Sequence, residues 1–283
     1  MIKTPTMQEL LEAGVHFGHQ VRRGNPRMGE FIFGAREGVH IINLEFSEKL
    51  LQKAADYVYK LGTEGKVILF VGTKKQASDL ISESATKLET PYVNFKWLGG
   101  LLTNFDEIRK NIDKLLDLKA KSAKGELSHY TKKEQLLISR KIEKFEKENG
   151  GIADMHTLPD ALFIIDCVNE KTAVTEANRI GIPIVAICDT NSNPAFVSYP
   201  IPGNDDATKS IKIITETIVN AYAEGLEEAK KLIRQLADKS QKDKEDAEKK
   251  EQEKLDNPEI LAEVEKMEEE VEKVTVGESK RIV

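Results

Sequence analysis

VILFV at residues 67–71, ALFII at residues 161–165 and IVAI at residues 184–187 are the stretches that decide the fold. Each run is continuously apolar rather than alternating, which is typical of strands in a parallel sheet that is covered on both faces. A turn signal or a helical pattern follows each run, and helices are expected from about Lys74 to Leu88, from about Glu170 to Ile180, and from Ala207 into the 220s. This alternation of strand and helix predicts a doubly wound α/β fold.

Two other patterns lie outside that repeat. Residues 31–33 and 40–42 flank a glycine-containing stretch and can pair as a β-hairpin. Residues 105–148 are helical in character and charged, and apolar side chains recur there at spacings of three or four. They are Phe105, Ile108, Ile112, Leu115 and Leu118, and then Leu137 (with its neighbours Leu136 and Ile138), Ile142 and Phe145. Two narrow apolar stripes joined by a polar tip at His129 and Tyr130 predict an antiparallel helical hairpin that projects from the domain.

The composition changes after Gly225, where the sequence becomes rich in Glu and Lys. We therefore expect an α/β domain over residues 1–225, which includes the inserted hairpin at 105–150, and a charged acidic extension over 226–283 that is largely helical or disordered. Within the extension, Leu261, Val264, Met267, Val271 and Val274 would line one face of a short helix that forms only against a partner. The alternative is a charged tail without a partner.

Overall composition excludes two classes of protein. The chain has 283 residues, of which 40% are hydrophobic, and no apolar run approaches the roughly 18 residues of a membrane span. The N-terminus lacks the apolar stretch of a signal peptide, so neither a membrane protein nor a secreted one is expected. Cys167 and Cys188 lie inside apolar runs, which favours a reduced, cytoplasmic protein over a disulfide scaffold.

The charge is unevenly distributed along the chain. The net formal charge of −6 combines +5 over residues 1–150 with −6 over residues 151–225 and −5 over residues 226–283. Binding to nucleic acid depends on where the charge sits rather than on the total. The first half of the chain is therefore where a nucleic-acid interface is expected.

Several stretches resemble one family, and they occur in that family's order: VHFGHQ (15–20), FIFGAR (31–36), VHIINLE (39–45), ILFVGTK (68–74), WLGGLLTN (97–104), LPDALFIID (158–166), GIPIVAICDTNSNP (181–194) and IPGNDDA (201–207). They are similar to bacterial small-ribosomal-subunit protein two. The resemblance covers residues 7 to about 225. It implies a flavodoxin-like three-layer α/β/α domain with an inserted antiparallel coiled-coil hairpin and no catalytic role. It also implies binding to small-subunit ribosomal RNA and to neighbouring ribosomal proteins, with support for attachment of the mRNA-binding protein one.

Candidate RNA-binding residues lie in three places. The N-terminal loop is rich in arginine, whose guanidinium groups pair well with phosphate oxygens, and the outer hairpin carries an excess of cations. The third place is the start of the helix that follows the strand at 67–71, where anions bind readily, together with a lysine next to Trp97. These residues are Arg22, Arg23, Arg27 and Arg36; Arg109, Lys110, Lys114, Lys132 and Lys133; and Lys74, Lys75 and Lys96. The alternative for each is a solvated surface charge, and for Trp97 it is core packing.

A metal site is the other candidate. His16 and His19 are three residues apart, and acidic side chains follow the predicted strands, namely Asp189, Asp205 and Asp206. Imidazole with carboxylate suits zinc, or magnesium if waters complete the shell. The alternatives are that His16 is a hydrogen-bonded core histidine and that Asp206 caps a helix. No cofactor is required, and a structural zinc or magnesium ion is an option.

Together these patterns predict a non-catalytic, ribosome-bound protein with no membrane or small-molecule partner. The alternative is a flavodoxin-like metal-dependent enzyme that uses His16, His19, Asp189 and Asp205. Against it, the sequence has neither a G-x-x-x-x-G-K-[ST] loop nor a G-x-G-x-x-G loop.

Overall fold

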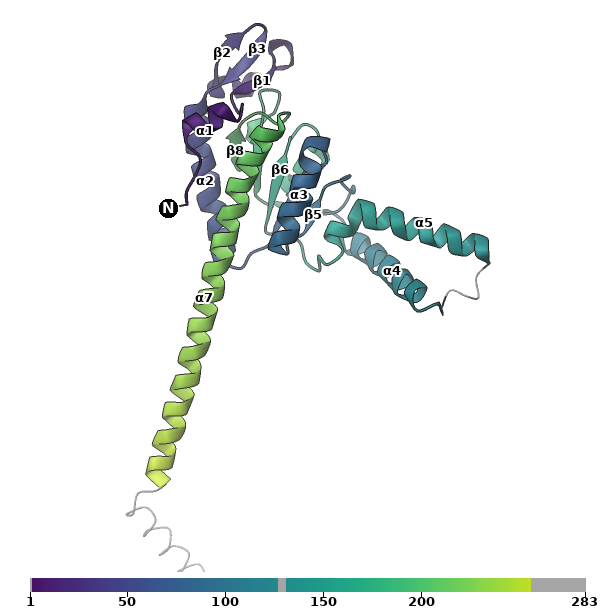
Figure 1. Cartoon of the computed structure of the whole chain (residues 1–283), viewed down its shortest axis with the longest axis vertical. Helices are drawn as coiled ribbons and strands as arrows, with labels where there is room; N and C mark the ends of the chain where they lie inside the picture. Colours follow the sequence, from purple (N-terminus) through teal and green to yellow (C-terminus); the bar gives the residue numbers. More distant parts are fainter. Residues whose placement is uncertain (1, 127–130, 256–283) are drawn as a thin grey trace, which may run out of the picture. The chain divides into compact units, whose positions relative to one another are not determined.

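The computed structural model describes residues 2–126 and 131–255, of which residues 236–255 are described by their backbone only (Figure 1). The chain divides into two compact units, residues 1–229 and residues 230–283. The helices are α1 (Met7–Glu12), α2 (Leu44–Thr63), α3 (Lys75–Leu88), α4 (Phe105–Ala123), α5 (Lys132–Asn149), α6 (Lys171–Ile180) and α7 (Thr208–Leu255). The strands are β1 (Phe17–Gln20), β2 (Ile32–Arg36), β3 (Val39–Ile42), β4 (Ile68–Val71), β5 (Tyr92–Val93), β6 (Ala161–Ile165), β7 (Ile184–Cys188) and β8 (Tyr199–Pro202).

A five-stranded parallel sheet forms the centre of the first unit. Its strands lie in the order β5-β4-β6-β7-β8, and every neighbouring pair is parallel. The three central strands and the helices that follow them coincide closely with the predicted stretches, which confirms an α/β fold. The two edge strands were not predicted, because β5 is very short and β8 reads YPIP, with prolines that are unusual within a sheet.

Alternate side chains of the sheet enter two separate cores. Ile68 and Phe70 of β4 pack with α2, α3 and α7 on one face, whereas Leu69 and Val71 pack with α6 and the base of α4 and α5 on the other. Because both faces are covered, the strands are apolar throughout, as the continuous runs in the sequence predicted.

A second, smaller sheet of antiparallel strands has the order β1-β3-β2. The predicted hairpin is confirmed, since β2 pairs with β3 across a turn in which Glu37 and Gly38 both have positive φ. The third strand, β1, was not predicted; it brings His19 to the carboxyl edge of the large sheet, where the His19 backbone N–H donates to Thr190 Oγ1 at 2.8 Å.

Helices α4 and α5 lie side by side as an arm: α4 leads away from the large sheet and α5 leads back to it (Figure 1). Ile112 of α4 and Phe145 of α5 are buried in the same core cluster, in agreement with the predicted stripes. Of the three neighbouring residues predicted at the start of the second stripe, Ile138 is half-buried, whereas Leu136 and Leu137 are 52% and 56% exposed, so Leu137 is not the inward residue. His129 and Tyr130 lie outside the described residues.

The C-terminal helix α7 begins at Thr208 and continues to Leu255, beyond the predicted domain boundary at Gly225. The apolar pattern expected at residues 261–274 lies outside the described residues. Among the helices that the structure does describe, none is both long and apolar enough to cross a membrane.

Candidate functional site

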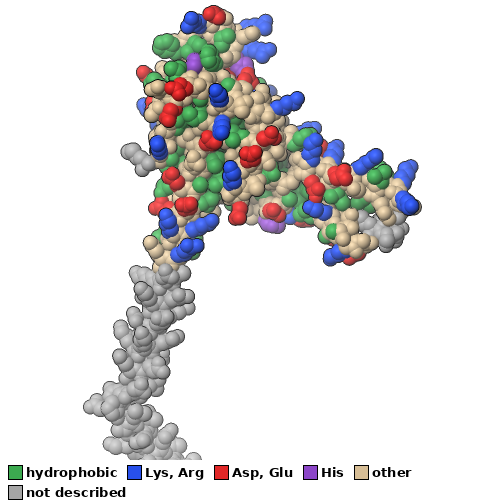
Figure 2. Space-filling model, in the orientation of Figure 1, with side chains coloured by type: hydrophobic (Ala, Val, Ile, Leu, Met, Phe, Trp, Pro, Cys, Tyr) green, Lys and Arg blue, Asp and Glu red, His purple; other side chains and the backbone are tan. Residues whose placement is uncertain are grey.

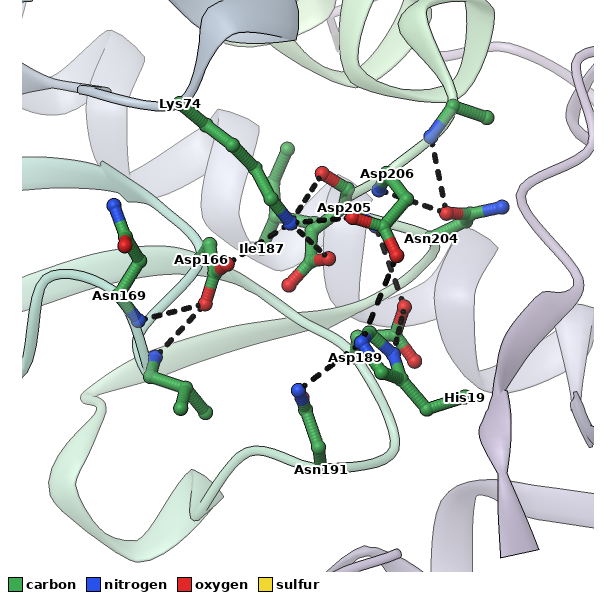
Figure 3. Close-up of polar contacts among 12 residues, drawn as sticks. His19, Lys74, Asp166, Asn169, Ile187, Asp189, Asn191, Asn204, Asp205 and Asp206 are labelled. Carbon is green, nitrogen blue, oxygen red and sulfur yellow. Dashed lines mark hydrogen bonds and ion pairs between the residues drawn. The ribbon is translucent and has the colours of Figure 1, made fainter. Parts of the chain in front are cut away.

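A cluster of charged side chains lies at the carboxyl edge of the large sheet (Figure 3). Lys74, which precedes α3, places its Nζ 2.9 Å from a carboxylate oxygen of Asp166, 2.8 Å from one of Asp205 and 2.7 Å from one of Asp206. Burial disfavours the charged amine, but the hydrogen bonds to Asp205, Asp206 and Asp166 outweigh it and raise the pKa of Lys74. The ammonium group is therefore held as a cation by three carboxylates.

His19 joins the same cluster from the small sheet. Its Nδ1 lies 3.0 Å from Asp189, its Nε2 lies 3.6 Å from Asp206, and Nε2 is also 3.2 Å from the amide nitrogen of Asn191. The hydrogen bond to Asp189 raises the pKa of His19 against the opposing effect of burial. The predicted residues His19, Asp189, Asp205 and Asp206 are thus brought together in the structure.

Asp205 is the least solvated acid of the cluster. Burial, together with the nearby Asp166 and Asp189 carboxylates, raises its pKa to about 7 even though Lys74 is in contact with it. One of its oxygens, Oδ2, is buried and has no hydrogen-bond partner among the described residues. Ligand atoms of His19, Asp205 and Asp206 all lie within 4.8 Å of one another, which is compact enough for one metal ion.

Two predicted members of this site have other roles. His16 lies outside the cluster; its ring contacts Phe17 at a centroid distance of 4.0 Å, and its buried Nδ1 has no hydrogen-bond partner among the described residues. The structure therefore gives no support, at this nitrogen, to the interpretation of His16 as a hydrogen-bonded core histidine. At the start of α7 the cap is formed by Asn204, whose Oδ1 accepts from the N–H groups of Asp206 and Ala207, whereas the Asp206 carboxylate faces Lys74 and His19.

Acidic side chains surround the residues that lead into α3. The backbone N–H of Thr73 donates to Glu170 Oε1 at 3.2 Å, and the charge of Lys74 is taken up by aspartates. An incoming phosphate would meet carboxylates here, which is electrostatically unfavourable. The expectation that Lys74 binds RNA therefore receives no support from its surroundings, although Lys75 is exposed at the first turn of α3.

The four arginines of the N-terminal region are exposed and belong to neighbouring short elements. Arg22 and Arg23 lie in the 3₁₀ turn Val21–Arg23, Arg27 lies in the 3₁₀ segment Pro26–Phe31, and Arg36 ends β2. Their contacts are mostly with uncharged groups: Arg22 donates to Gln20 at 2.8 Å and Arg27 to Asn193 at 3.5 Å. Within the described part of the chain the only ion pair of this group joins Arg36 to Glu37 at 4.0 Å. Their charge is therefore open to solvent and to a ligand.

The predicted cations of the arm differ in how they are used. Arg109 is structural, because its Nη1 donates to the backbone carbonyls of Ala153 at 2.6 Å and Met155 at 3.1 Å and so fastens the base of α4. Lys110 pairs with Glu107, whereas Lys114, Lys132 and Lys133 are exposed. Sequence reasoning left out two exposed cations of α5, Arg140 and Lys141, although their excess over the acids around them was visible in the sequence.

Lys96 is exposed, but the adjacent Trp97 is buried, and its Nε1 donates to Glu176 at 3.1 Å. Trp97 therefore belongs to the core, and its ring is not available to stack on a base.

Comparison with known proteins places this chain in a family. The family model described as Ribosomal protein S2 matches residues 10–225. The chain belongs to the ribosomal protein S2 family. Proteins named small ribosomal subunit protein uS2 are 52% identical in a Nitratiruptor species, over 78% of this chain and 83% of theirs, and 48% identical in Helicobacter hepaticus, over 80% and 85%. The uS2 protein of Wolinella succinogenes is 49% identical over 78% of this chain and 81% of its own. The family is structural rather than enzymatic, and these matches give no support to a metal-dependent enzyme.

Proposed function

We propose that this chain is a cytoplasmic, ribosome-bound constituent of the small ribosomal subunit and that it binds small-subunit ribosomal RNA. The observation that carries the proposal is the group of exposed arginines, Arg22, Arg23, Arg27 and Arg36, on and beside the small sheet. Arginine forks bind phosphate oxygens in a bidentate manner, and phosphate contacts orient a protein on a nucleic acid. In this proposal the chain has a structural role: it binds and orients RNA within the subunit, and it takes no part in the reaction chemistry of translation.

Membership of the family also supports partners among the other ribosomal proteins, including the mRNA-binding protein one. The acidic residues 151–225 and the extension at 226–283 suit protein partners or solvent better than RNA, because like charges repel the phosphate backbone.

The domain organisation follows the same proposal. Numbered along the sequence, the parallel strands have the order 2-1-3-4-5, which supports a flavodoxin-like fold. The shared core of α4 and α5 supports a coiled-coil hairpin inserted at 105–150. The family match ends at residue 225, which supports a domain over 1–225 followed by an extension over 226–283, although Leu226 still packs on the core.

The proposal is tested by reversing the charge of three arginines. The triple variant Arg22→Glu, Arg23→Glu, Arg27→Glu should keep its fold, because these side chains are exposed, and should lose affinity for small-subunit RNA. Binding is measured at two salt concentrations, since phosphate contacts make affinity fall with salt. Lysine-to-glutamate changes at the exposed positions Lys49, Lys53 and Lys60 of α2 provide a control with the same change in net charge. Wild-type affinity in the arginine variant would remove this loop from the interface.

A structural metal ion is a second, smaller proposal, carried by the unpartnered Oδ2 of Asp205 beside His19 and Asp206. An imidazole among the ligands favours zinc over magnesium. Elemental analysis of the purified chain should find near-stoichiometric metal that is lost in His19→Ala and retained in His156→Ala, whose histidine lies outside the cluster. A metal content near zero in the wild-type chain would refute this proposal.

A further inference from the structure

Two thiols that the proposed function does not use lie in contact beneath the carboxyl edge of the large sheet. The Sγ atoms of Cys167 and Cys188 are 3.9 Å apart, and both side chains belong to the apolar core that also contains Leu162 and Ile164 of β6. Cys167 is 8% exposed, and Cys188 is fully buried. At this separation no other atom fits between the two sulfurs.

The contact depends on the turn that follows β6. Ile165 of β6 is the register partner of Ile187 in β7, so Cys167 lies one residue further along its strand than Cys188. In uninterrupted strands, two side chains one position out of step would point to opposite faces of the sheet. Asp166 breaks this alternation with a φ of 67°, and the side chain of Cys167 enters the same core as that of Cys188.

The left-handed conformation of Asp166 is stabilised by its own carboxylate (Figure 3). One oxygen accepts from the backbone N–H groups of Val168 at 2.9 Å and Asn169 at 3.0 Å, and the other lies 2.9 Å from Lys74 Nζ. Such a backbone conformation is uncommon for a residue other than glycine. The turn that supplies Asp166 to the charged cluster is therefore the same turn that holds the two thiols together.

The placement of the thiols suits a disulfide bond. Disulfides join residues whose Cα atoms are about 4.4–6.8 Å apart, and neighbouring strands of a sheet lie about 4.8 Å apart. The two sulfurs would have to approach by about 2 Å to reach a bond of about 2.05 Å, so a shift of about 1 Å at each sulfur is enough. Both cysteines are free in the structure, as expected for a reducing compartment, where disulfides form transiently under oxidation.

We propose that Cys167 and Cys188 are a peroxide-sensitive modification site that closes into a reversible disulfide within one chain. The sulfur of Cys167 attacks one oxygen of hydrogen peroxide, the O–O bond breaks, and a sulfenic acid and one water form. The sulfur of Cys188 then attacks the sulfenic sulfur, an S–S bond forms, and the hydroxyl group leaves with the Cys188 proton as a second water. The two thiols lose two electrons in total, which reduce one peroxide to two waters.

The surroundings of the thiols favour a small, uncharged oxidant. Figure 2 shows charged side chains of both signs on the face of the molecule that it draws, and both thiols lie below the surface. The hydrogen bond with Cys188, together with burial, raises the pKa of Cys167, so little thiolate is present and the first step is slow. Once Cys167 is oxidised, Cys188 is already in contact with it, and closure should outrun further oxidation.

The test follows the thiols of the full chain during exposure to hydrogen peroxide. Aliquots are unfolded in the presence of N-ethylmaleimide, and their intact mass is measured. Reduced wild type takes up two maleimides, whereas the oxidised chain should take up none and be lighter by two hydrogen atoms, at a rate independent of protein concentration. Dithiothreitol should restore both maleimides. Trypsin digestion without reductant should join the peptides 148–171 and 180–209, which carry the two cysteines.

The variants Cys167→Ala and Cys188→Ala are the matched controls, because neither can close the bond and neither places a polar group in the core. Neither variant should give a monomer that has lost two hydrogen atoms; should either fail to fold, the peptide map of wild type decides the question alone. Two free thiols in wild type, after an exposure that oxidises free glutathione completely, would overturn the proposal. Disulfide-linked dimers, or oxygen added to Cys167 while Cys188 stays free, would overturn it as well, because the contact would not then direct the reaction.

Discussion

Removal of the Glu176 side chain should lower the stability of the fold, because its carboxylate accepts hydrogen bonds from four residues of one loop. It lies on α6 and is buried, and it accepts hydrogen bonds from Trp97 Nε1 at 3.1 Å and from the backbone N–H groups of Gly100 at 2.8 Å, Leu102 at 3.1 Å and Thr103 at 3.3 Å. The loop leads directly into α4, so Glu176 fixes where the arm begins.

The size of the effect follows from the donors left behind in Glu176→Ala. Trp97 and Leu102 are almost fully buried, and each unsatisfied buried donor costs about 1–3 kcal/mol. The donors of Gly100 and Thr103 are half-buried or exposed and can reach water. The two buried donors together give an expected loss of about 2–6 kcal/mol in the free energy of unfolding. Glu176→Gln keeps one acceptor oxygen and should lose about half as much.

Urea unfolding followed by tryptophan fluorescence measures this loss directly, because Trp97 is the single tryptophan of the chain and donates to Glu176 itself. Glu83→Ala, at an exposed position on α3, is the control and should change stability by less than about 0.5 kcal/mol. A Glu176→Ala variant as stable as this control would refute the argument.

The pH dependence gives a second check on Glu176. Burial opposes ionisation, but the hydrogen bonds from Gly100, Trp97, Leu102 and Thr103 outweigh it and lower the pKa of Glu176. A carboxyl whose pKa is lower in the folded state stabilises the fold above the unfolded value of about 4.3. That stability is lost as the pH falls through the folded pKa. The difference between wild type and Glu176→Ala should therefore shrink below about pH 4, and a difference that stays constant down to about pH 3 would contradict the assignment.

Three further changes have defined outcomes in urea unfolding. In the metal-free protein, burial and neighbouring carboxylates raise the pKa of Asp205 to about 7. With metal removed by a chelator, wild type should therefore lose stability relative to Asp205→Asn as the pH rises from about 4 to about 7, by at most about 1.4 kcal/mol per pH unit. Gly225→Ala places a Cβ against the carbonyl oxygen of Tyr59, well inside van der Waals contact, and should cost about 1–3 kcal/mol, where alanine in an open helix would stabilise. Arg109→Gln removes charged hydrogen bonds to two carbonyls and should cost about 1.5–3 kcal/mol, with faster amide exchange at the base of α4.

The central strands and helices could be predicted from the sequence because their signals are local. β4, β6 and β7 are buried on both faces, so every residue in them is apolar, and the turns that follow are marked by glycine or aspartate. β1 and β8 depend on partners far away in the sequence: β1 pairs with β3, and β8 joins the sheet beside β7 although it contains two prolines. No local pattern distinguishes such segments from loops.

The candidate sites were predictable in residue type but not in role. Asp189, Asp205 and Asp206 were grouped from their expected place at the strand ends and His19 from its spacing to His16, and the structure brings these four residues together. Lys74 could not be assigned from the sequence, because the three carboxylates that hold it come from loops before α6 and α7. The role of Arg109 could not be assigned from the sequence either, since its partners are backbone carbonyls more than forty residues away.

The cluster of Lys74, His19 and the aspartates also bears on how the arginines that we propose to bind RNA are held in place. Ligands of doubly wound folds usually occupy the crevice at the carboxyl ends of the strands. Here Lys74 occupies that edge together with aspartates, and His19 of β1 is bound to the same group through Asp189 and Asp206. The hydrogen bond from the backbone N–H of Asn25 to the carbonyl of Thr190, at 2.8 Å, attaches the arginine-bearing loop to the same edge. The contacts at this edge therefore hold the small sheet and the arginine-bearing loop against the large sheet. A substitution that weakens the cluster should increase the mobility of the loop before it unfolds the large sheet.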